Sequence, residues 1–121
     1  MGCKCSNRDI DFSKASSKEE VIELLELQAD YIRREIQEIR ENKINELSNS
    51  CSKINFLATI HNESLDFTEK IRRINIFPSD GKFNSLTFFL NEFFACVKNE
   101  NQNEHLRTKT NIEILLKANG N

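Results

Sequence analysis

The chain has 121 residues, which is enough for one domain with a hydrophobic core of its own. Hydrophobic residues make up 38% and charged residues 30%, as is ordinary for a helical domain in water. The formal net charge of −2 argues against general attraction to nucleic acid, and no stretch approaches the roughly 20 apolar residues of a membrane span.

The N-terminus carries a pattern for fatty acylation. The chain starts Met-Gly-Cys-Lys-Cys-Ser, which fits the myristoylation pattern Met-Gly-x-x-x-Ser through Gly2 and the recognition residue Ser6. Cys3 and Cys5 lie beside it and offer thiols for palmitoylation, the second chain that stable attachment requires. No apolar secretory signal is present, so in a eukaryotic cell we expect reduced thiols and attachment to the cytoplasmic face of a membrane.

Two other interpretations of the same residues remain. The segment can be an unmodified tail, or its two cysteines can bind a metal with ligands from elsewhere in the chain. Those ligands would be Cys51, Cys96, His61 or His105. Their scattered spacing matches no zinc pattern, so we expect no metal and no cofactor.

Few residues in the chain break helices. There is one Pro and there are three Gly, which favours long helices. Residues 1–16 show no apolar periodicity and predict a flexible tether, whereas residues 17–121 predict a helical domain. We expect a small all-α bundle of three to four helices, over residues 17–47, 51–75, 84–99 and 105–118.

The first expected helix begins with a capping box, in which Ser17 and Glu20 bond each other's backbone amides. Its apolar residues then follow 3-4-3-4 spacing at Ile22, Leu25, Ala29, Ile32, Ile36 and Ile39. This spacing is the seam of a coiled coil, but it lasts for fewer than three heptads. Further apolar residues widen the face, so the helix packs either within a bundle or in a short dimeric coiled coil.

Two joints are expected further along the chain. The first is Ser48-Asn49-Ser50, and the second is Phe77 to Gly81, where Pro78 forbids helix continuation. Asn62 and Ser64 can divide the helix between these joints into two shorter ones.

The helix expected over 84–99 is the most hydrophobic segment, apolar over most of its circumference. Such a helix must be covered on more than one side, either as the central helix of the bundle or by a partner; the central position is the version that we expect. Together with the seam of the first helix it gives the candidate interaction surface: Ile32, Ile36, Ile39, Phe89, Phe93 and Phe94.

Catalytic patterns are missing. His61 and His105 lie among polar neighbours and are expected at the surface, while Cys96 reads as a small core hydrophobe. There is no phosphate-binding Gly-rich loop, no HExxH and no EF-hand loop. We therefore expect no enzyme, no small-molecule substrate and no nucleic-acid partner.

The segment from Ile74 to Val97, INIFPSDGKFNSLTFFLNEFFACV, resembles the opening of the capsid domain in the Gag polyproteins of retroelements. The matching positions are Phe77, Gly81, Phe89 and Phe93, in a turn followed by a helix with paired aromatics. The resemblance implies a helical protein that assembles into a shell. No zinc-knuckle cysteine array accompanies it.

The function expected from these patterns is that of a lipid-anchored helical adaptor or scaffold. It would bind the membrane through its acyl chains and act through a protein partner or a homodimer. The alternatives are a Gag-like self-assembling protein and a lipid-anchored regulator of an enzyme.

Overall fold

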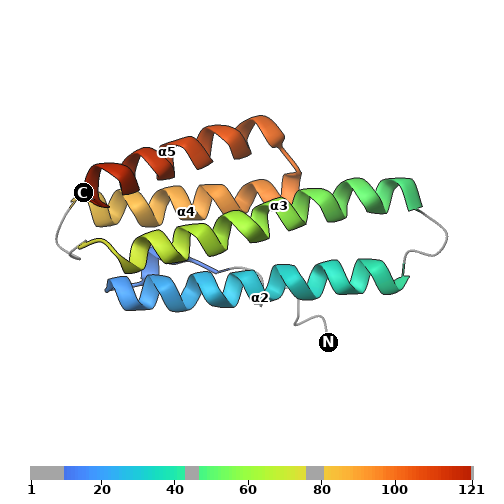
Figure 1. Ribbon diagram of the computed structural model, residues 1–121, viewed down its shortest axis with the longest axis horizontal. Coiled ribbons are helices and arrows are strands. Elements are labelled where there is room, and N and C mark those ends of the chain that lie inside the picture. Colours follow the sequence, from blue (N-terminus) through green and yellow to red (C-terminus); the bar gives the residue numbers. More distant parts are fainter. Residues whose placement is uncertain (1–9, 43–46, 76–80, 121) are drawn as a thin grey trace.

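The computed structural model describes residues 10–42, 47–75 and 81–120. These ranges form four α-helices and one 3-10 turn, with no strand among them (Figure 1). The prediction of a small all-α bundle is thus confirmed. The elements are η1 (Phe12–Lys14), α2 (Lys18–Asn42), α3 (Leu47–Arg72), α4 (Gly81–Asn99) and α5 (Gln102–Gly120).

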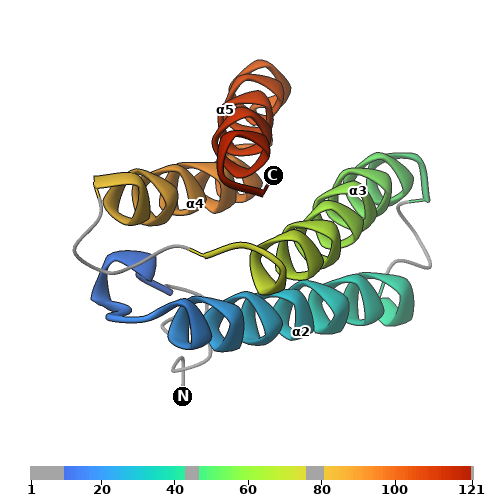
Figure 2. The same ribbon diagram turned by 60° about the vertical axis from the view of Figure 1, so that its left-hand side comes forward.

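The helices form two antiparallel hairpins. In Figures 1 and 2, α2 lies along α3 and α4 lies along α5. The turn η1 packs on α4, and α5 touches α3 over a short stretch. The core lies between the hairpins and is built mainly from Leu, Ile and Phe side chains of all four helices.

The start of α2 follows the capping prediction in part. The Ser17 Oγ accepts from the Glu20 amide at 3.2 Å, as expected. The Glu20 carboxylate, however, accepts from the Ser16 amide at 2.6 Å, one residue earlier than the capping box places it. The seam residues of α2 then pack against α3 within the same chain, with Ile32 only 1% exposed.

The first joint lies earlier than the sequence analysis places it. The helix α2 ends at Asn42 and α3 begins at Leu47, so Ser48-Asn49-Ser50 are helical rather than a joint. Ser and Asn cost only a few tenths of a kcal/mol in a helix, and tertiary packing overrides so small a preference. Asn62 and Ser64 do not divide α3, where the buried Ser64 hydroxyl donates to the His61 carbonyl oxygen at 2.7 Å.

The predicted tether of residues 1–16 is too long, because the fold already includes residues from 10 onward. Phe12 is fully buried, and its ring stacks on Phe94 with 5.5 Å between centroids. The sequence hides this contact, since one Phe in a polar segment has no periodicity. Residues 1–9 lie outside the described part of the chain.

Lys18 closes the open end of the α2–α3 hairpin. Its Nζ donates to the carbonyl oxygens of Arg72 at 3.2 Å and Ile74 at 2.9 Å, at the C-terminal end of α3. A cation there satisfies free carbonyls and complements the helix dipole. The start of α2 is therefore tied to the end of α3.

The joint between α4 and α5 consists of Glu100 and Asn101. Glu100 has φ 50°, in the left-handed region, and the Asn101 amide donates to the Cys96 carbonyl oxygen at 3.3 Å. These are features of a Schellman-type helix end. The Asn101 Oδ1 then accepts from the Glu104 amide at 3.1 Å and caps α5.

Replacing Glu100 by Gly should stabilise the protein. A left-handed conformation costs an L-residue roughly 1 kcal/mol that Gly avoids, and the exposed Lys53–Glu100 pair at 3.6 Å contributes little. We expect Glu100→Gly to raise the melting temperature by about 3–5 °C. Asn103→Gly, inside α5, is the control and should lower it. An unchanged or lower melting temperature for Glu100→Gly would show that the left-handed conformation of Glu100 does not destabilise the fold.

Candidate functional site

The residues of the predicted acyl anchor, Gly2, Cys3, Cys5 and Ser6, lie outside the described part of the chain. What the structure shows is where the chain enters the fold. Asn91 on α4 holds this point: its Oδ1 accepts from the Phe12 amide at 2.8 Å, and its Nδ2 donates to Asp11 Oδ1 at 3.0 Å. Hydrogen bonds from Ser13 and Asn91 lower the pKa of the Asp11 carboxyl. We call Asp11, Phe12 and Asn91 the N-terminal clamp.

The predicted interaction residues are largely taken up by the core. Ile32, Phe93 and Phe94 are buried within the chain, so they offer no surface to a partner in this fold. Ile36, Ile39 and Phe89 are half-buried and pack against the same core. Phe93 and Phe94 are neighbours in the sequence, with 5.0 Å between ring centroids, and they lie in the same hydrophobic core as Ile32. The Phe-rich helix is therefore covered mainly by this chain itself, which is the version expected from the sequence.

A partly buried polar cluster links α5 to α3, and it was not predicted from the sequence. His105 Nε2 lies 2.6 Å from Glu63 Oε1, and Lys109 Nζ lies 3.2 Å from Glu63 Oε2. Hydrogen bonding and charge from Glu63 raise the pKa of Lys109. His105 was expected at the surface but is only 5% exposed, because the rings of Phe56 and Phe93 cover it at 5.6 and 5.4 Å.

A signal for half of this cluster exists in the sequence. His105 and Lys109 are four residues apart, so they share a face of α5. Glu63 lies 42 residues before His105, and no local pattern joins the two. By contrast, His61 is half-buried, and burial together with the charge of Arg33 lowers its pKa.

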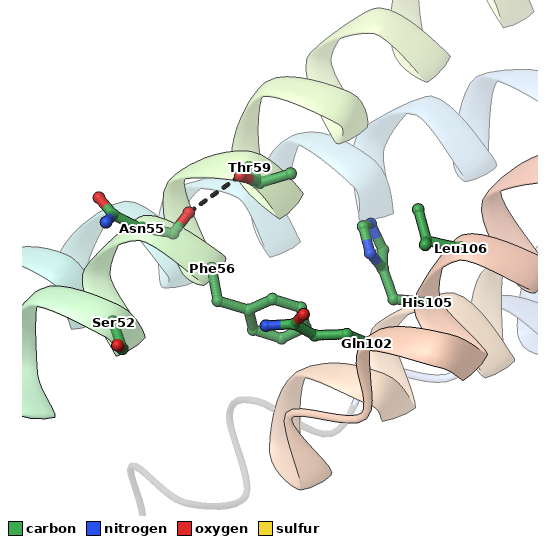
Figure 3. Close-up of a pocket in the computed structure, with 7 residues that line it drawn as sticks. All are labelled: Ser52, Asn55, Phe56, Thr59, Gln102, His105 and Leu106. Atoms are coloured by element: carbon green, nitrogen blue, oxygen red, sulfur yellow. Dashed lines mark hydrogen bonds between the residues drawn. The ribbon is translucent and has the colours of Figure 1, made fainter.

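A shallow pocket of about 380 Å³ opens beside this cluster, between α3 and α5. Figure 3 shows Phe56 and Thr59 on α3 facing His105 and Leu106 on α5. The Thr59 hydroxyl is bonded back to the Asn55 carbonyl oxygen at 2.9 Å. The remaining lining residues are uncharged and polar: Ser52, Asn55 and Gln102.

The arrangement holds α5 on α3 rather than presenting a reactive group. Both Glu63 oxygens are engaged, one by His105 and the other by Lys109. Cys96 is buried, as predicted, and burial raises the pKa of its thiol, which disfavours the reactive thiolate. In the described ranges, no three His, Cys, Asp or Glu side chains lie close enough to hold a metal ion.

No protein-family model, curated protein or solved structure matches this chain. Among the described helices, none has the length and apolar character to cross a membrane. The positions of the Gag resemblance fall in different environments. Phe77 lies outside the described residues, Gly81 begins α4, and Phe89 and Phe93 are half-buried and buried.

Proposed function

We propose that this protein is a lipid-anchored adaptor or scaffold on the cytoplasmic face of a membrane. The observation that carries the proposal is the start Met-Gly-Cys-Lys-Cys-Ser, in which Gly2 and Ser6 fit the myristoylation pattern and Cys3 and Cys5 adjoin it. A myristoyl chain alone gives a membrane association constant on the order of 10⁴ M⁻¹, so attachment would be reversible. A palmitoyl chain on Cys3 or Cys5 would make it lasting.

The folded domain supports an adaptor role. The clamp of Asp11, Phe12 and Asn91 fixes the chain on the domain soon after the anchor, so acylation would hold the domain beside the bilayer. No catalytic group is assembled among residues 10–42, 47–75 and 81–120, and the exposed faces of the helices suit binding to a partner. A Gag-like shell protein and a regulator of an enzyme remain the alternatives. Assembly into large particles would favour the first, and a stoichiometric complex with an enzyme would favour the second.

Gly2→Ala should release the protein from membranes. Acylation uses the Gly2 amine after removal of Met1, and palmitoylation follows the first membrane contact. We expect the variant in the soluble fraction after cell fractionation, while Cys3 and Cys5 changed together to Ser should leave weak, reversible binding. Asn7→Ala lies outside the pattern and is the control that should stay on the membrane. A Gly2→Ala protein that remained fully membrane-bound would overturn the proposal.

A further inference from the structure

The N-terminal clamp fixes which side of the domain the anchor must leave from. Two hydrogen bonds and one ring stack hold Asp11 and Phe12 on α4: Asn91 bonds both, and Phe94 stacks on Phe12. In Figure 2, η1 lies against α4 on the side away from α5. The acylated segment therefore starts from the η1 side of α4.

The reach of the anchor is short. Cys5 lies five residues before Ile10, so the two Cα atoms are at most about 18 Å apart, and Gly2 adds about 10 Å to that limit. An acyl chain on Cys5 would thus keep Ile10, and the clamp that follows it, close to the lipid headgroups.

That face of α4 carries few charges among its described residues: the half-buried Glu92 lies one turn from Phe88, and the exposed Asp11 is bonded to Asn91 at its edge. Between Phe83 and Val97, the exposed residues are Asn84, Phe88 and Ala95, which share one side of the helix. Phe88 is 56% exposed and rests on the half-buried Phe89, with 5.9 Å between ring centroids. None of the three must lose the hydration of a charge when it meets a lipid surface.

The outer side of α2 gives a contrast. Its exposed positions include charged residues on successive turns: Glu23, Glu26, Arg33, Arg34 and Glu38. Pressing such a face onto a bilayer would dehydrate several charges. The outer face of α4 is therefore the better surface for lipid on the side where the anchor starts.

We propose that the outer face of α4 lies on the membrane and that Phe88 enters the headgroup–acyl boundary of the bilayer. Asn84 and Ala95 would lie at the level of the headgroups. The pocket between α3 and α5 would be turned toward the solvent. The inference rests on the proposed acyl anchor. It adds a third hydrophobic contact and gives the adaptor a fixed orientation.

A tryptophan reporter tests this orientation. The chain contains no Trp, so the Phe88→Trp variant has a single Trp, at the proposed membrane contact. Leu106→Trp is the matched control, because Leu106 is 57% exposed but lines the pocket between α5 and α3. Both acylated variants are floated with phosphatidylcholine–phosphatidylserine vesicles. We expect the emission of the Trp at position 88 to shift to the blue and to be quenched by brominated lipids, with neither change at position 106.

The outcomes separate the orientation from the anchor. Suppose that both variants float while the emission of the Trp at position 88 neither shifts nor is quenched, or that both positions respond equally. Either result would contradict contact between the α4 face and the membrane, but it would support the anchor. If neither variant floats, the anchor fails and the inference falls with it. In a background with Cys3 and Cys5 changed to Ser, Phe88→Ser should lower vesicle partitioning roughly fivefold. Leu106→Ser should leave partitioning unchanged.

Discussion

Ile32→Asp is expected to unfold the domain rather than to dissociate a dimer. Ile32 is 1% exposed and packs in the core formed where α2 meets α3. Loss of its side chain costs about 2–5 kcal/mol, and the unpaired buried carboxylate adds a desolvation penalty. The sum approaches the whole stability of a small domain, about 5–15 kcal/mol. Circular dichroism should show lost helicity or a much lower melting temperature.

Leu27→Asp is the matched control for this experiment. Leu27 lies on the same helix but is 41% exposed, so the same charge stays in water and the fold should be kept. Sedimentation of both variants distinguishes bundle from coiled coil. If Ile32→Asp turned a dimer into a folded monomer, the seam would be an interface between chains, and the packing of α2 on α3 would not be its main role.

The first helix shows what periodicity alone can predict. Ile22, Leu25, Ala29 and Ile32 repeat at 3-4-3 spacing, which fixes one buried face whatever covers that face. The same spacing does not say whether the cover is α3 or a second chain. The structure places α3 there, because the next helix of this chain returns along α2. The sequence therefore predicts the helix and its buried face, but not the partner of that face.

Features made by distant residues could not be predicted. Phe12 is an isolated apolar residue in a polar segment, and its burial depends on Asn91 and Phe94, about 80 residues further along the chain. His105 has polar sequence neighbours, yet Phe56 and Phe93 cover it. In both cases the decisive neighbours belong to other elements, so no window on the sequence contains them.

The proposed membrane-facing surface depends both on a local sequence pattern and on contacts between distant residues. The acylation pattern can be read from the first six residues alone. Whether acylation also orients the domain depends on the clamp. A tether of sixteen free residues would let the domain turn in any direction. Because the described fold begins by Ile10, Cys5 lies at most about 18 Å from its first residue. If the proposed acyl anchor holds, the orientation at the bilayer would follow from the fold, and the test at Phe88 decides it.

Phe93→Ala should be among the most destabilising truncations of the core. Phe93 is fully buried, and three rings surround it: Phe67 of α3 at 5.2 Å, Phe94 of α4 at 5.0 Å and His105 of α5 at 5.4 Å. Removing it leaves a cavity where three helices meet, at a cost of about 3–5 kcal/mol. For a chain of this length, the melting temperature should fall by roughly 10–20 °C.

Phe88→Ala provides the comparison on the same helix. Because the Phe88 ring is more than half exposed, its removal should change the free energy of unfolding by less than about 1 kcal/mol. Chemical denaturation of both variants, followed by circular dichroism, gives the two free energies. If Phe93→Ala melted like the parent protein and lost binding to a partner, Phe93 would be an interface anchor. Its burial among Phe67, Phe94 and His105 predicts the opposite, a loss of stability.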